Sequence, residues 1–341
     1  MKIAVVASPV TPLRPAQQGG AQAFLCDLAT GLAERGHDVR LHCAEGSDVA
    51  GVRLVMVPAP RDARAALVIP GGAPPPPAPG VAAALEAMFD AIAADRVDAV
   101  SQHAFDALAF TLARGLPVLH TLHLPPIVES VVRAAVQVEG ARLATVSASC
   151  QAAWRSAGVE VGELLPNGVG DEPVPAKPDH TALIAGRISP EKGIEHALAA
   201  ARNAGLAVRI AGAPYDPAYE VDLSATEQLG SLTRRDLRLV MARSAVTICA
   251  IRWEEPFGMV AAEAQMAGCP VAAYRRGALP EVVEEGVSGY LAAPDDIGDL
   301  SHAIRRCLAL DRAAVRASAR RRLGLGVAVD RYEKALERAA Q

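Results

Sequence analysis

Short runs of β-branched and other apolar residues alternate with longer alanine-rich stretches along the chain. The short runs are typical of buried strands, and the longer stretches are typical of helices. In the first half the predicted strands are Lys2–Ala7, Val39–His42, Val52–Val57, Ala99–Gln102, Val118–His120 and Arg142–Val146. In the second half they are Thr181–Ala185, Val208–Ala211, Ala225–Leu229, Val246–Ala250, Val271–Ala273 and Tyr290–Ala292.

Most of the longer stretches lie between these strands. The predicted helices are Gly20–Arg35, Val81–Ala94, Pro190–Ala204, Thr233–Arg243, Gly258–Ala267, Ile297–Leu310 and Val327–Ala340. Strands that alternate with helices form parallel sheets with helices on both faces. Two such series in succession predict an α/β protein with two doubly wound domains facing a cleft.

A segment rich in proline and glycine, residues 165–178, separates the two series and indicates a linker. We therefore predict an N-terminal domain over residues 1–168 and a C-terminal domain over residues 169–326. The last stretch, residues 327–341, is expected to be a helix that could pack back on the first domain.

Composition narrows the class of protein. The length of 341 residues suits two domains. A net charge of −4 argues against a general affinity for nucleic acid or anionic membranes. The six cysteines are scattered without metal-binding spacing, which is typical of reduced thiols, so we expect a cytoplasmic protein. We expect no signal peptide and no transmembrane segment, while a peripheral membrane contact stays open.

The segment from Trp253 to Ala267 carries the strongest chemical signal. Glu255 and Glu263 flank a predicted helix start at Pro256–Gly258. A helix N-terminus offers unpaired N–H groups that suit a phosphate, and a carboxylate can accept hydrogen bonds from a sugar diol. A rise of about 1.5 Å per residue puts Glu263 roughly 7–8 Å beyond Gly258, the order of one phosphate-to-ribose step. The segment favours a sugar-nucleotide pocket over two ordinary surface glutamates.

A second charged segment follows a predicted strand and enters a helix: Gly186–Gly193, with Arg187 and Lys192 at the strand's carboxyl end. Ligands of open α/β sheets bind at this edge, and two cations could neutralise a diphosphate. The alternative is a solvated turn with surface charges. The glycine spacing is not that of a P-loop.

Three further positions follow strands of the first half. Gln18–Ala21 contains two glycines that would let the backbone approach a ligand, although it is not a dinucleotide-binding fingerprint. His103 and His123 follow two predicted strands, so both should lie at the carboxyl edge of the first sheet. Either histidine could instead be a structural residue, and His120, inside its strand, is expected in the core.

In this order the motifs resemble those of the retaining glycosyltransferases of family 4, also called group 1, which have the GT-B fold of two Rossmann-like domains. The resemblance spans almost the whole chain. It rests on Gln18–Ala21, Leu32–Val39, Asp98–His103, Thr121–His123, Pro166–Val169, Gly186–Gly193, Glu255–Glu263 and Pro280–Val283.

The resemblance implies a role for each matched residue. Arg187 and Lys192 would hold the donor diphosphate and stabilise its departure. Glu263 would bind the ribose hydroxyls, and Glu255 would contact the donor sugar. His103 would lie beside the reacting sugar; together with Arg187, Lys192 and Glu255 it forms the expected catalytic set.

Further contacts follow from the same resemblance. His123 would lie near the acceptor or the sugar. The other donor-binding positions would be Gly19, Gly20, Phe257, Gly258, Met259 and Val260. The chain departs from the family pattern at Gly170, where an aspartate is common, and at Ala278, where a glycine is common.

The implied reaction moves a sugar from a nucleotide diphosphate, with UDP expected, to an acceptor hydroxyl on a small molecule, glycan or lipid. There is no Asp-x-Asp motif at a strand end, so we expect no metal and no cofactor. Two enzyme alternatives on the same fold are a nucleotide-sugar epimerase and a glycan phosphorylase. A third alternative is a sugar-nucleotide-binding subunit without turnover.

Overall fold

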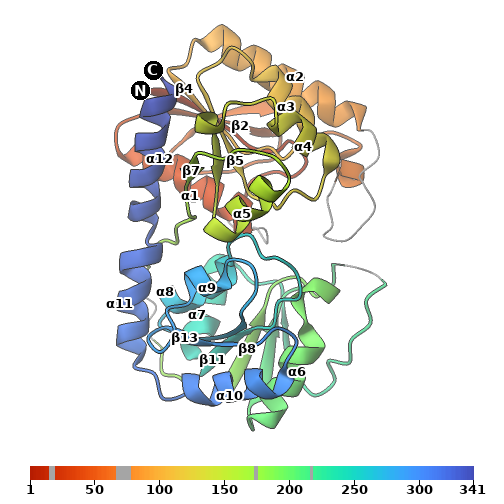
Figure 1. The fold of residues 1–341 in the computed structure, drawn as a ribbon, viewed down its shortest axis with the longest axis vertical. Coiled ribbons are helices and arrows are strands. Elements are labelled where there is room, and N and C mark those ends of the chain that lie inside the picture. Colours follow the sequence, from red (N-terminus) through yellow and green to blue (C-terminus); the bar gives the residue numbers. More distant parts are fainter. Residues whose placement is uncertain (15–19, 67–77, 173–175, 216–217) are drawn as a thin grey trace. The chain divides into compact units, whose positions relative to one another are not determined.

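The computed structural model describes residues 1–14, 20–66, 78–172, 176–215 and 218–341, which form two compact units (Figure 1). Among the described residues, unit 1 comprises residues 1–14, Ala21–Pro166 and Ala328–Gln341, and unit 2 comprises Gly20 and Asn167–Val327. Each unit has its own parallel sheet covered by helices, so the predicted α/β fold with two doubly wound sheets is confirmed.

The sheet of unit 1 has the order β3-β2-β1-β4-β5-β6-β7, and every neighbouring pair is parallel. The strands are β1 (Lys2–Val6), β2 (Asp38–Ala44), β3 (Arg53–Val57), β4 (Ala99–Gln102), β5 (Val118–Leu122), β6 (Leu143–Thr145) and β7 (Glu163–Leu164). The strand order reverses between β1 and β4. Such a topological switch point is where open α/β sheets bind ligands, beyond the carboxyl ends of the strands.

The helices of unit 1 include the last helix of the chain. They are α1 (Gly20–Glu34), α2 (Pro79–Asp95), α3 (Ala107–Leu112), α4 (Glu129–Ala135), α5 (Ala148–Ser156) and most of α12 (Leu325–Ala339), with 3₁₀ turns η1 (Ala63–Ala66) and η2 (Gly140–Arg142). Arg35, just after α1, forms ion pairs with Asp330 at 2.5 Å and Glu333 at 2.7 Å on α12. The rings of Phe24 and Tyr332 lie 5.6 Å apart between the same two helices.

The sheet of unit 2 has the order β10-β9-β8-β11-β12-β13, and it is also parallel throughout. The strands are β8 (Thr181–Ala185), β9 (Ala207–Ala211), β10 (Glu227–Gly230), β11 (Val246–Cys249), β12 (Val271–Tyr274) and β13 (Gly289–Ala292). Here the order reverses between β8 and β11.

The helices of unit 2 are α6 (Ile194–Asn203), α7 (Arg234–Arg243), α8 (Met259–Met266), α9 (Leu279–Val282), α10 (Ile297–Cys307) and α11 (Arg312–Leu323), with the 3₁₀ turn η3 (Pro190–Lys192). Alternate strand residues such as Ile184, Ile210 and Ile248 form a core with α6 and α10, as the period-two pattern of a strand requires. α8 packs with α7 and α11 and also contacts β11 and β12 (Figure 1). None of the helices in the described ranges combines the length and the apolar character needed to cross a bilayer.

One local prediction is wrong. The helix predicted over Pro190–Ala204 is interrupted, because Gly193 adopts φ 60° and α6 begins only after it. A Cβ at Gly193 would lie 2.0 Å from the carbonyl oxygen of Ala250, so this position requires glycine. Within the segment predicted as a linker, residues 165–178, Asn167 and Val169 are buried, and Val169 pairs with Gly324.

Candidate active site

The loop after β8 brings two cations to the switch point of unit 2. Arg187 follows the end of β8 by two residues, and Lys192 closes η3. The backbone N–H of Arg252, just beyond β11, donates to the carbonyl of Glu191 at 2.8 Å, and Gly193 packs against Ala250. The two loops on either side of the switch point are therefore held together by backbone contacts.

Each cation is already paired within unit 2. A guanidinium N–H of Arg187 donates to Glu191 at 3.3 Å, and the guanidinium lies 4.4 Å from the ring centroid of Tyr215. Lys192 donates to Oε2 of Glu255 at 2.9 Å. The Lys192 and Glu255 side chains are 17% and 14% exposed, so the pair is reachable from solvent but only partly screened by it.

Trp253 completes this group. Its indole Nε1–H donates to the same carboxylate oxygen of Glu255 at 2.9 Å, and its ring centroid lies 5.9 Å from Nζ of Lys192. Glu255 therefore accepts two hydrogen bonds at one oxygen.

Cys249 ends β11 below this loop. Burial raises the pKa of its thiol to about 12, so Cys249 is a neutral structural residue.

The helix start predicted beside Glu255 is present. Gly258 is the N-cap of α8 with φ 97° and makes no side-chain cap, so the first amides of α8, at Met259 and Val260, have no intrahelical acceptor. Phe257 is buried and anchors the turn. The N-terminus of α8 is thus an anion-binding geometry beside a carboxylate–ammonium pair.

Glu263 lies one turn further along α8. Its carboxylate is 3.8 Å from the guanidinium of Arg234, at the start of α7, and the two side chains are 12% and 21% exposed. Arg234 was not predicted as a site residue. The pair orients the carboxylate proposed to hold a ribose.

The loop after β12 holds the backbone of Glu254 and Glu255 in place. The N–H of Ala278 donates to the carbonyl of Glu255 at 2.8 Å, and the N–H of Gly277 donates to the Glu254 side chain at 3.1 Å. Gly277 has φ 56°, and a Cβ there would lie 2.4 Å from the Glu255 nitrogen. This segment therefore acts on the site through the Glu255 backbone, which the sequence pattern did not predict.

In unit 1, His103 and His123 follow β4 and β5 and meet at the carboxyl edge of the sheet. Nδ1 of His103 lies 2.8 Å from Nε2 of His123, and Nε2 of His103 lies 2.8 Å from Oγ of Ser101. The ring of Tyr332, on α12, stacks on His103 at a centroid distance of 5.9 Å. Ser101 and Tyr332 were not predicted to take part.

Both histidines are neutral. Burial lowers the pKa of His123 to about 4 and that of His103 well below its ordinary value, with the neighbouring histidine adding to the effect at His103. Their exposed fractions are 7% and 8%. The pair can offer hydrogen bonds without carrying charge at neutral pH.

The predicted site residues thus fall into two groups. Arg187, Lys192, Glu255, Glu263 and the start of α8 belong to unit 2, and His103 and His123 are brought together in unit 1. Gly20 is the first residue of α1. Gly19 lies outside the described residues.

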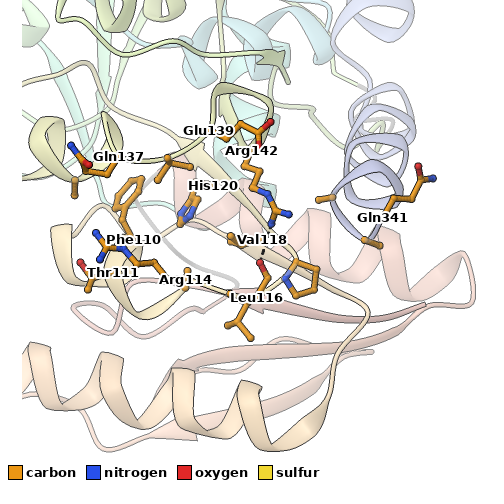
Figure 2. A pocket seen from close by; sticks show the side chains of 17 residues that line it. Phe110, Thr111, Arg114, Leu116, Val118, His120, Gln137, Glu139, Arg142 and Gln341 are labelled. Atoms are coloured by element: carbon orange, nitrogen blue, oxygen red, sulfur yellow. Dashed lines mark hydrogen bonds between the residues drawn. The ribbon is translucent and has the colours of Figure 1, made fainter.

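A separate pocket of about 450 Å³ opens at the opposite, amino end of β5 in unit 1 (Figure 2). Its lining includes Arg114, Glu139, Arg142 and the buried His120, whose ring stacks on Phe110 at 4.5 Å. Arg142 donates to the carbonyl of Leu116 across it. None of the predicted site residues lines this pocket.

Two parallel-sheet units, each with polar side chains beyond its switch point, define the class of two-domain α/β proteins that bind ligands at sheet edges. The chain belongs to the glycosyltransferases of group 1 and family 4. Residues 171–323 match the family model described as Glycosyl transferases group 1, and residues 18–172 match that of Glycosyltransferase Family 4.

Curated relatives match part of the chain. A glycogen synthase of Mycobacterium tuberculosis (strain CDC 1551 / Oshkosh) is 34% identical over 155 residues, which is 41% of this chain and 37% of the relative. A D-inositol 3-phosphate glycosyltransferase of Mycolicibacterium smegmatis is 37% identical over 147 residues, 39% of this chain and 34% of the relative. The matched region spans about a third of the length of these relatives.

Solved structures match the whole fold. AviGT4, a glycosyltransferase involved in avilamycin A biosynthesis, has a TM-score of 0.75 at 22% identity, covering 99% of this chain and 98% of that one. HepE from Anabaena, in complex with UDP-glucose, has a TM-score of 0.74 at 18% identity, covering 99% of this chain and 100% of that one. The predicted GT-B fold is confirmed.

Proposed function

We propose that this protein is a retaining glycosyltransferase that moves a sugar from a nucleotide-diphosphate sugar, with UDP as the nucleotide, to an acceptor hydroxyl. The observation that carries the proposal is the grouping in unit 2 of Arg187, Lys192, Glu255 and the uncapped start of α8. Cations and helix amides beside a carboxylate fit a diphosphate next to hydroxyl groups.

The donor half of the reaction follows from these charges. As the bond from the sugar to the diphosphate breaks, negative charge develops on the leaving phosphate. Arg187, Lys192 and the amides of Met259 and Val260 would stabilise that charge, because preorganised donors need little reorganisation during the reaction. This assigns to side chains of the protein the neutralisation that a metal ion supplies elsewhere.

The carboxylates would orient the rest of the donor. Glu263 would accept hydrogen bonds from the ribose hydroxyls, and Arg234 would hold its carboxylate in place. Glu255 would accept a hydrogen bond from the donor sugar once Lys192 turns to the phosphate. Bound donor would thus exchange the internal ion pair for phosphate contacts.

His103 would act on the sugar side. It is neutral and held by hydrogen bonds, so it can form a hydrogen bond with a sugar hydroxyl without adding a charge. The Anabaena structure of the same fold, which is a complex with UDP-glucose, supports a UDP sugar as the first donor to test.

Retention at the anomeric carbon rests on the family resemblance. The described contacts of His103 come from Ser101, His123 and Tyr332, none of which is a carboxylate placed to attack as in a double-displacement glycosidase. NMR of the product glycoside would test retention through its anomeric configuration, which should match that of the donor.

The direct experiment incubates the protein with UDP-glucose, UDP-galactose, UDP-N-acetylglucosamine and GDP-mannose, with water or a mixed acceptor pool, and follows products by mass. Transfer adds a sugar to an acceptor and releases the nucleoside diphosphate. An epimerase would interconvert donors without a change in mass, and a binding subunit would give no turnover. Either of these results contradicts the proposal.

A further inference from the structure

The polar contacts around His103 form a chain of three side chains, Ser101, His103 and His123, which we call the imidazole chain. Both ring nitrogens of His103 are used: Nε2 lies 2.8 Å from Ser101 Oγ, and Nδ1 lies 2.8 Å from His123 Nε2. The residues come from adjacent strands, since Ser101 is on β4 and His123 follows β5. His103 therefore has a partner on each side before any substrate arrives.

Each imidazole in the chain is neutral and carries one proton. Two proton arrangements satisfy both hydrogen bonds. In the first, His123 Nε2–H donates to Nδ1 of His103, and His103 Nε2–H donates to Ser101. In the second, every direction is reversed, so that Ser101 donates to His103 and His103 donates to His123.

The far nitrogen of His123 distinguishes the two arrangements. Nδ1 of His123 is buried and has no hydrogen-bond partner among the described residues. In the second arrangement this atom would carry a buried N–H without an acceptor, whereas the first leaves only a lone pair there. Orphaned buried N–H groups are the rarer and more costly case, so the first arrangement is favoured.

The rings around the chain keep it in this geometry. His123 packs against Phe24 of α1 at a centroid distance of 6.4 Å, and His103 is stacked between His123 at 5.1 Å and Tyr332 of α12 at 5.9 Å. His120, on β5, is the other histidine whose charge would act on His103, and burial lowers its pKa to about 3. The whole cluster stays uncharged.

We propose that His123 is a positioning residue for His103: it donates to Nδ1 of His103 and so keeps the proton of His103 on Nε2. This inference deepens the proposed function and rests on it. Of the two partners of His103, only the Ser101 hydroxyl can turn away by rotation about one bond. Nε2–H is therefore the group that His103 presents to an oxygen of the sugar, and His123 determines that this group is a donor.

The test uses the full chain and two readouts. ¹⁵N NMR of histidine-labelled protein, with the His103 signal assigned through His103→Gln, reports the tautomer in the free protein. UDP release from UDP-glucose, or from the sugar nucleotide that the donor panel identifies, reports kcat and the KM for donor. The variants are His123→Phe, which keeps a planar ring without an N–H, and His123→Gln, which restores a donor.

We expect the Nε2–H tautomer of His103 in the wild type and a mixture in His123→Phe. A histidine in the wrong tautomer can lose up to about 10⁴ in turnover, so His123→Phe should lower kcat at least about 10-fold with little change in donor KM. His123→Gln should recover most of that loss. His120→Phe is the matched control, because His120 is a buried histidine of β5 outside the imidazole chain, and this variant should leave kcat and the His103 tautomer unchanged.

An Nδ1–H tautomer of His103 in the wild type would overturn the proposal, even if His123→Phe failed to fold. Unchanged kcat in a folded His123→Phe, or equal losses in His123→Phe and His123→Gln, would overturn it as well. Absence of any transfer by the wild type would count against the proposed function instead, because the NMR result still decides whether His123 sets the tautomer.

Discussion

The two groups of candidate site residues are built on opposite physical principles. In unit 1 the histidines are buried and neutral, and they are held by aromatic rings and short hydrogen bonds. In unit 2 the residues are charged and partly exposed, and each cation has an acidic partner. The first arrangement fixes the positions of the side chains before substrate binds. The second holds cations in internal ion pairs, and a bound diphosphate can replace the carboxylate partners.

This difference indicates which chemistry each group can support. A neutral cluster can orient hydroxyl groups but cannot neutralise a diphosphate. A set of ion pairs can neutralise a diphosphate, provided that the ligand outcompetes the internal carboxylates. Each of the predictions below perturbs one of the two units.

The largest effect is expected at Lys192. Lys192→Ala removes one preorganised cation from the leaving diphosphate and leaves the Glu255 carboxylate facing the phosphates. Loss of one such donor typically lowers turnover by about 10²–10³. Steady-state kinetics measure this, with Lys177→Ala, an exposed lysine of the same unit, as control. Turnover equal to that of the Lys177→Ala variant would show that Lys192 is a surface charge only.

A second prediction concerns acid stability and the neutral histidines of unit 1. Burial lowers the pKa of His42, on β2, to about 4, while an unfolded histidine titrates near 6.5. Between these values the unfolded state binds more protons, so the stabilisation is complete above about pH 6.5 and is lost as the pH falls toward 4. One such histidine costs roughly 2 kcal/mol at pH 5 relative to pH 7.

His42→Leu should therefore reduce the drop in unfolding free energy between pH 7 and pH 5 by about 2 kcal/mol, measured by denaturant titration at both values. Both ring nitrogens of His42 are buried without partners in the described structure, so the substitution breaks no hydrogen bond there. Replacing the exposed His302 by leucine is the control and should leave the drop unchanged. Identical pH dependence in His42→Leu and wild type would mean that His42 titrates normally.

The smallest effect is expected at Glu255, where the direction of the change in nucleotide affinity is more informative than its size. Glu255→Gln removes the carboxylate that competes with phosphate for Lys192. The affinity for a nucleoside diphosphate without sugar should rise by about 2–5-fold, the range of a partly exposed ion pair, while sugar transfer falls. Calorimetry with UDP and a transfer assay measure the two changes. A weaker affinity for UDP would indicate that Glu255 supports the nucleotide directly.

The sequence predicted those parts of the site that depend on local order. Strands β4 and β8 were assigned with their observed ends, because a short apolar run bounded by polar residues or glycine indicates a buried strand. This placed His103 and Arg187 beyond strand ends. The start of α8 followed from the Pro-Phe-Gly turn before Met259.

Long-range contacts could not be predicted in the same way. The left-handed Gly193 that interrupts the helix after Pro190 is required by Ala250, which lies far along the chain. Arg234 and Tyr332 join the sites through tertiary packing, which no local spacing reports. Ser101 is different, because it lies two residues before His103, the spacing that puts two side chains on one face of a strand. The helices α3, α4 and α9 and the two-residue β7 are too short to give a periodic signal.

One missed element did carry a local signal. Helix α11 buries Val315, Ala319 and Leu323, which recur at every fourth position as on one face of a helix. No element was predicted over residues 312–323, where arginines lie between these apolar positions.

The proposed function depends most on Arg187 and Lys192 binding the diphosphate of a nucleotide, and isothermal titration calorimetry tests this binding directly. Wild type and Arg187→Ala/Lys192→Ala would be titrated with UDP, GDP and ADP, and with uridine as the ligand without phosphates. We predict that one diphosphate, UDP, binds the wild type far more tightly than uridine does, and that the double variant loses at least about 100-fold in affinity, as two charge-assisted hydrogen bonds require. Failure of all three diphosphates to bind the wild type, or equal affinity in the double variant, would contradict the account.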